Sequence, residues 1–260
     1  MKIHINNPSK LLVYILTIFV MGSSLGSCNV GTLEPESTNL GLEYFPLEEG
    51  QYIDYQVEDI QYTILNPPDT SRYQLRELIG EEFIDIEGNP AFRLERYRRA
   101  DANAPWALDS IWQIKRSTTQ AIVIQNNQPL IKLVFPLGEG VEWVGTAFFR
   151  VNRTDTIIDP VTSDTTIQET FIGDRYRVEN FNKPLTFGDF SFDSTLTVIQ
   201  SDDSSRISID RRREIYAANR GLIYKDGIVA TYCTPSESCP FPEIEFGKKT
   251  TQTIIGFGKL

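Results

Sequence analysis

QYIDYQVE, which occupies residues 51–58, is the stretch that decides the fold class. Apolar Ile53, Tyr55 and Val57 alternate there with polar residues, and a period of two places alternate side chains on opposite faces of a strand. We therefore expect a β-strand with one buried face and one face in water. Pro46 and Gly50 precede it and suit a turn that leads into the strand.

Similar strand signals, separated by turn residues, continue along the chain. Residues 83–86 and 92–95 flank the turn sequence EGNP, and residues 121–125 and 130–135 flank Asn126-Asn127. Asn and Gly tolerate the positive φ that short hairpin turns require. Near the end, three strands joined by glycine turns and then a closing strand are expected, at residues 214–216, 222–225, 228–232 and 251–257.

These signals predict a mainly β protein with a curved antiparallel sheet, which forms either a half-barrel or a β-sandwich-like arrangement. Residues 141–151 predict one long strand with a bend at Gly145. No window shows a convincing helical period, although residues 73–79 and 209–218 are each compatible with a short helix.

Two similar words suggest an internal duplication. FPLEEG at residues 45–50 and FPLGEG at residues 135–140 each precede a strand signal. The possible halves are residues 42–134 and 135–260. Chance similarity between two strand beginnings is the alternative, because six residues are too few to establish a repeat.

The composition limits the kinds of functional site. The chain has a net charge of −10, which repels phosphate backbones, so nucleic acid is not expected as a partner. Its single histidine, His4, lies in an N-terminal segment that has the features of a secretion signal. Removal of that segment excludes His-dependent triads and His-ligated metals. We expect no cofactor and no metal.

Cys233 and Cys239 lie in the sequence CTPSESC near the C-terminus. In an oxidising compartment, such a close pair predicts a disulfide that closes a small loop. A redox-active pair is the alternative, but such pairs usually have the tighter Cys-x-x-Cys spacing.

The N-terminus has the order of features found in a secretion signal. Lys2 and Lys10 are basic, residues 11–21 form an apolar run too short to span a bilayer, and LGSC follows at residues 25–28. LGSC in this context resembles the lipobox of bacterial lipoproteins. An ordinary signal peptide cut near Ser27 is the alternative.

The lipobox resemblance implies a division of the chain into a signal peptide at 1–27, a flexible tether at 28–41 and a β domain at 42–260. It implies acyl chains on Cys28, which would anchor the protein in the outer membrane facing the periplasm or the cell surface. If cleavage follows the ordinary pattern instead, Cys28 is a free thiol.

A second resemblance concerns the β domain. The word FPLxxG followed by Tyr, together with EIYAANRGLIY at residues 214–224, is similar to a group of envelope lipoproteins from Bacteroidota. This resemblance implies a strongly curved sheet whose concave side holds acyl chains or peptides. It implies no enzymatic activity.

The leading functional hypothesis is an envelope binding or structural module for a lipid or another hydrophobic ligand. Aromatic side chains suit an apolar lining, although most must fill the β core. The candidate ligand-binding residues are Tyr52, Tyr55, Trp143, Tyr216 and Tyr224.

Two other classes of function remain open. A surface module would contact a protein or glycan through loops such as residues 154–166. A glycan hydrolase would need two carboxylates across a cleft. The doublets Glu48-Glu49 and Glu81-Glu82 do not form such a pair by themselves, because adjacent strand residues point to opposite faces. Glu139 is the third acid considered; we name no catalytic residue and expect no enzyme.

Two charged clusters have both a functional and a structural interpretation. The arginines at 93, 96, 98 and 99 suit either an anion site or a solvated strand face, and the interleaved Glu95 and Tyr97 favour the face. Asp155, Asp159 and Asp164 suit either calcium or an exposed turn, and they lack the spacing of an EF-hand loop.

Overall fold

The computed structural model describes residues 39–64, 66–148, 152–158, 165–171, 173–234, 239 and 241–260. Apart from one short 3-10 helix, the regular elements of these residues are all β-strands. The elements are η1 (Leu42–Tyr44), β1 (Gln51–Thr63), β2 (Asn66–Ile84), β3 (Pro90–Arg99), β4 (Ala107–Arg116), β5 (Gln120–Gln125), β6 (Gln128–Val134), β7 (Glu142–Val144), β8 (Asn152–Ile158), β9 (Thr165–Phe171), β10 (Arg175–Phe187), β11 (Phe190–Ser204), β12 (Ser208–Ala217), β13 (Gly221–Tyr232) and β14 (Ile244–Lys259).

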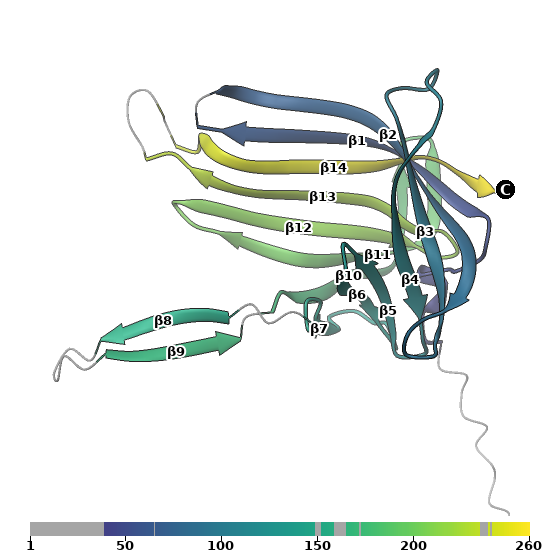
Figure 1. The fold of residues 1–260 in the computed structure, drawn as a ribbon, viewed down its shortest axis with the longest axis horizontal. Helices are drawn as coiled ribbons and strands as arrows, with labels where there is room; N and C mark the ends of the chain where they lie inside the picture. Colours follow the sequence, from purple (N-terminus) through teal and green to yellow (C-terminus); the bar gives the residue numbers. More distant parts are fainter. Residues whose placement is uncertain are drawn as a thin grey trace, which may run out of the picture. The chain divides into compact units, whose positions relative to one another are not determined.

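Twelve of the strands form one antiparallel sheet, in the order β6-β5-β4-β3-β2-β1-β14-β13-β12-β11-β10-β7. The sheet curves strongly, so that β3 to β6 cross the direction of β11 to β14 (Figure 1). Strands β8 and β9 pair separately as a hairpin. The predicted mainly β fold with a curved antiparallel sheet is confirmed. Within the described part of the chain, no helix has the length and apolar character needed to cross a membrane.

The hairpin predictions rest on local chemistry and are confirmed. Asn126 and Asn127 have φ of 50° and 61° and join β5 to β6, while Gly88 has φ of 82° between β2 and β3. On β1, Tyr55 and Val57 are both buried, as the two-residue period predicts. A register shift between Asp54 and Tyr55 changes the alternation near the start of the strand.

The order of the strands explains why the sheet closes on itself. Strands β6 and β7 are its two edges, yet only residues 135–141 separate them. A flat sheet of twelve strands would be about 50 Å wide. Seven residues span about 25 Å at most, so the edges must approach each other.

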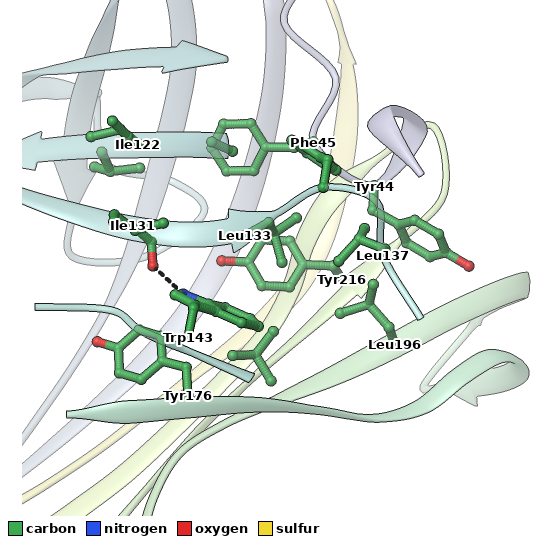
Figure 2. Packing of buried hydrophobic residues seen from close by; sticks show 14 of the residues in the cluster. Tyr44, Phe45, Ile122, Ile131, Leu133, Leu137, Trp143, Tyr176, Leu196 and Tyr216 are labelled. Atoms are coloured by element: carbon green, nitrogen blue, oxygen red, sulfur yellow. Dashed lines mark hydrogen bonds between the residues drawn. The ribbon is translucent and has the colours of Figure 1, made fainter. Parts of the chain in front are cut away.

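One backbone hydrogen bond joins the two edges of the sheet. The N–H of Ile131 on β6 donates to the carbonyl of Gly145, immediately after β7, at 2.9 Å. The indole N–H of Trp143 donates to the carbonyl of Ile131, also at 2.9 Å, as Figure 2 shows. The result is a barrel-like sheet that is nearly complete.

A hydrophobic core lies inside this curved sheet, and Figure 2 shows its packed side chains. Both copies of the repeated FPLxEG motif contribute to this core. Phe45 from the first copy and Phe135 and Leu137 from the second belong to the same buried cluster. Arg116 on β4 donates hydrogen bonds to the carbonyls of Leu42 and Phe45, at 2.8 and 2.6 Å, and thereby fixes the segment before β1. The duplication itself stays a prediction.

Four local predictions are wrong, and pairing with neighbouring strands accounts for three of them. Residues 73–79 and 209–218 are not helical, because β2 and β12 each pair with a strand on both sides. Asp226-Gly227 makes no turn, since β12 and β14 continue their pairing with β13 past it. The strand expected over residues 141–151 is confined to β7, which is followed by a turn.

Candidate ligand-binding cavity

A cavity of about 400 Å³ lies within the curved sheet, next to the packed core. Phe45, Leu94, Ile114, Val123 and Tyr216 belong to both, so the cavity begins where the core ends. Other parts of its lining are exposed to solvent, namely Asn219, Arg220, Phe257 and Lys259. The cavity therefore has a closed apolar end and an opening.

A buried charged cluster forms part of the wall. Glu214 on β12 is 1% exposed, and its Oε1 lies 2.6 Å from Lys132 Nζ on β6. Its Oε2 accepts a hydrogen bond of 2.7 Å from the hydroxyl of Tyr216. Because β6 and β12 are distant in the sheet order, the ion pair ties two parts of the barrel together across its interior.

Lys225 on β13 lies opposite Glu214 in the strand register, with its Nζ 3.7 Å from Glu214 Oε1. This lysine lies deep within the protein, yet 39% of its side-chain surface is accessible. That surface faces the cavity, whose lining includes Lys225. The ammonium group is therefore available to a molecule inside the barrel.

The titration of these groups follows from burial and from their neighbours. Burial alone would raise the pKa of Glu214, but Lys132, Lys225 and the hydrogen bonds from Lys132 and Tyr216 lower it to about 2. Glu214 is consequently an anion at neutral pH. Burial lowers the pKa of Lys225, and Lys132 lowers it further, against the opposing effect of Glu214.

A second ion pair also lines the cavity. Arg96 Nε on β3 is 3.1 Å from Glu77 Oε1 on β2, and both side chains are largely buried. The guanidinium also lies 3.9 Å from the ring centroid of Trp112, a contact of cation–π type. All three residues line the cavity, so its polar wall includes two neutralised carboxylates.

Gln252 on β14 completes the polar wall. It is 6% exposed, lines the cavity and pairs in register with Lys225 on the adjacent strand. Its side chain lies near the hydroxyl of Tyr55, which donates its own proton to the carbonyl of Leu222 at 2.7 Å. Gln252 Nε2 has no hydrogen-bond partner among the described residues, which is costly for a buried amide.

The structure brings together three of the five predicted ligand-binding residues. Tyr52, Tyr55 and Tyr216 all line the cavity. Trp143 instead packs in the core against Tyr176, with ring centroids 5.8 Å apart. Tyr224 packs against the side chain of Phe187 at 4.9 Å between ring centroids, and it is not part of the cavity wall.

The arginine cluster divides between the cavity and the surface. Arg96 belongs to the cavity wall, whereas Arg98 and Arg99 stack on Tyr73 and Trp106 at 3.7 and 4.2 Å from the ring centroids. Arg93 is half exposed and lies 3.8 Å from Glu81. The cluster thus divides among aromatic stacking, a surface ion pair and the cavity wall, to which Arg96 alone of the four belongs.

Three of the other acids considered from sequence, Glu48, Glu81 and Glu139, have partners in the structure. Glu48 pairs with Lys259, and Glu139 accepts hydrogen bonds from the backbone N–H groups of Asn180 and Phe181. Glu49, Glu81 and Glu82 are absent from the cavity wall. No pair of these acids faces another across it.

The predicted cysteine pair is found at disulfide distance. The Cα atoms of Cys233 and Cys239 lie 6.3 Å apart, as the loop spacing predicts. Cys28, the signal segment and most of the tether lie outside the described residues, as do Asp159 and Asp164. Leu40, at the end of the predicted tether, already contacts the fold, since its carbonyl accepts a hydrogen bond from Leu137 N–H at 3.0 Å.

The sequence reasoning missed four functional candidates: Lys132, Glu214, Lys225 and Gln252. Lys132 had a usable signal, because it interrupts the apolar run LIKLV at residues 130–134. Glu214, Lys225 and Gln252 lie in strand segments rich in polar residues, such as RRRE at residues 211–214 and KKTTQT at residues 248–253, and such residues are expected to face solvent. Here the face that they occupy is the interior of the barrel.

Comparison of the chain with protein-family models, with curated proteins and with solved structures finds no match. The interpretation of the cavity therefore rests on its own chemistry.

Proposed function

We propose that this protein is an envelope binding module that holds an elongated amphipathic molecule inside its curved sheet. The observation that carries the proposal is the cavity of about 400 Å³ beside the packed core. Small-molecule sites have volumes of this order and combine an apolar wall with a few placed polar groups. Phe45, Ile53, Leu94 and Ile114 supply apolar wall here.

The state of the buried carboxylate favours binding over glycoside hydrolysis. A glycosidase needs a carboxylic acid with a raised pKa to protonate the leaving group. Lys132 and Lys225 lower the pKa of Glu214 to about 2, and Glu77 is paired with Arg96. The two carboxylates of the wall are thus suited to holding the side chains of Arg96, Lys132 and Lys225 in place.

An envelope anchor forms part of the proposal. Acyl chains on Cys28 would hold the β domain at the membrane, where apolar ligands are concentrated. A Cys28→Ser chain should incorporate no label from radioactive palmitate and should leave the membrane fraction. Equal labelling of the two chains would refute the anchor while leaving the cavity proposal untouched.

The cavity proposal is tested with an uncharged apolar probe. The full chain, held in an amphipathic polymer instead of detergent, is titrated with N-phenylnaphthylamine, whose fluorescence rises on transfer from water to an apolar site. Ile114→Trp fills the cavity from its buried end and should abolish the rise. Ile111→Trp is the matched control, because Ile111 lies on the same strand but is 53% exposed.

Native mass spectrometry of protein released gently from its own envelope gives the second readout. The wild type and Ile111→Trp should retain an apolar adduct, and Ile114→Trp should lose it. If the wild type neither binds the probe nor retains an adduct, the cavity proposal is wrong.

A further inference from the structure

The lining of the cavity has the opposite charge to the chain as a whole. It contains five cationic side chains and two carboxylates, in a protein whose net charge is −10. Low-dielectric walls focus such a field and favour a ligand of opposite sign. The five cations are Arg96, Lys132, Arg220, Lys225 and Lys259.

Most of these cations already have partners. Arg96 pairs with Glu77, Lys132 with Glu214, and Lys259 with Glu48. Arg220 lies at the exposed opening and stacks on the ring of Phe257 at 4.4 Å. Among the described residues of the cavity wall, Lys225 is therefore the basic side chain inside the barrel that lacks a close carboxylate partner.

Lys225 has only a weak share in the Glu214 ion pair. Glu214 Oε1 lies 2.6 Å from Lys132 Nζ but 3.7 Å from Lys225 Nζ, which is beyond hydrogen-bond distance. Glu214 Oε2 is occupied by the Tyr216 hydroxyl. Both carboxylate oxygens thus have nearer donors, and the ammonium group of Lys225 retains bonding capacity toward the cavity.

Gln252 supplies a second unsatisfied donor beside this lysine. The two residues are direct register partners on β13 and β14, so their side chains emerge next to each other on one face. Gln252 Nε2 is buried without a hydrogen-bond partner among the residues that the structure describes. An ammonium group and an amide N–H together suit a group that only accepts hydrogen bonds.

We infer that Lys225 and Gln252 form a head-group site for a single-chain carboxylate of fatty-acid type. One carboxylate supplies the close counter-charge that Lys225 lacks and accepts hydrogen bonds from both side chains. Its hydrocarbon chain would then lie along the apolar wall formed by residues such as Leu94, Ile114 and Val123. This inference rests on the proposed function and names its ligand class.

The test compares ligands that share a chain and differ in the head. The full chain in amphipathic polymer is titrated calorimetrically with dodecanoate, dodecanol, dodecyl phosphate and dodecyltrimethylammonium. Dodecanoate should bind at least about tenfold more tightly than dodecanol, and the cationic compound should bind most weakly. In Lys225→Met and Gln252→Leu, dodecanoate should lose about tenfold or more in affinity while dodecanol keeps its own.

Lys248→Met is the matched control, because Lys248 lies on β14 with 53% of its side chain exposed and pairs with Asp59. It should leave all affinities unchanged. Equal binding of dodecanoate and dodecanol, or unchanged discrimination in Lys225→Met, would overturn the head-group site and leave the cavity proposal standing. Tighter binding of the phosphate would overturn the carboxylate assignment. Absence of binding by every compound would refute both proposals.

Discussion

Replacement of Glu214 by Gln is the most direct test of the buried charged cluster. The substitution keeps the shape of the side chain and removes the negative charge that Lys132 and Lys225 share. The difference between an ordinary pKa of 4.5 and about 2 corresponds to about 3 kcal/mol of stability at neutral pH, at about 1.4 kcal/mol for each pH unit. Solvent screening does not reduce this free energy, because the Glu214 side chain is 1% exposed.

The sign of the pH dependence follows from the lowered pKa. An acid whose pKa is lower in the folded state stabilises the fold above its unfolded pKa, here about 4.5. That stabilisation is lost as the pH falls toward about 2. The difference in unfolding free energy between the wild type and Glu214→Gln should thus be largest at neutral pH and should shrink in acid.

Urea unfolding followed by circular dichroism at several pH values measures this difference. Glu142→Gln is the control, because the Glu142 and Arg175 side chains are 42% and 70% exposed and such surface pairs contribute about 1 kcal/mol or less. The reasoning fails if Glu214→Gln unfolds within about 1 kcal/mol of the wild type at neutral pH. It also fails if the difference between the two chains does not change with pH.

Three further substitutions test other parts of the fold. Tyr216→Phe removes a hydrogen bond to the Glu214 carboxylate and should cost about 1.5–3 kcal/mol in urea unfolding; a neutral result would contradict the bond. Gly145→Ala places a Cβ 2.1 Å from the Tyr176 ring and should lower the unfolding free energy by about 1–3 kcal/mol. Adding Tyr176→Leu should restore part of that stability. Cys239→Ser opens the small loop and should cost about 2 kcal/mol, whereas equal melting of this variant and the oxidised wild type would argue against the disulfide.

Local chemistry explains which parts of the fold could be predicted from sequence. Asn126-Asn127 and Gly88 have backbone angles that few other residues adopt, so the turns that they form are visible in the sequence. Asp226-Gly227 also consists of residues that favour turns, but it continues a strand. There, Asp226 pairs with Arg213 on β12 at 2.6 Å, and β14 pairs on the other side. Tertiary pairing overrides turn propensity at that position.

The cavity was harder to predict than the strands. Alternation of apolar and polar residues reveals a strand, but it does not show which face of the strand is exposed to solvent. Tyr52, Tyr55 and Tyr216 were found because aromatic side chains suit a lining. Glu214 and Lys225 were missed, because each adjoins another charged residue, Arg213 and Asp226 respectively, and charged residues in a strand usually face solvent. Only the closure of the sheet, which depends on strands distant in sequence, turns that polar face inward.

The number of strands connects this fold to a hollow interior. About eight strands make a barrel that side chains just fill or that holds one small ligand, and wider barrels leave space unless other segments plug them. Here Tyr44, Phe45, Phe135 and Leu137 pack inside a twelve-stranded sheet, whereas the residues that the structure describes leave the space beside Lys225 and Gln252 as a cavity. The segment before β1 and the connection between β6 and β7 thus supply part of the packed core inside the barrel. The cavity follows from that arrangement, and its free donors determine which ligand it would select.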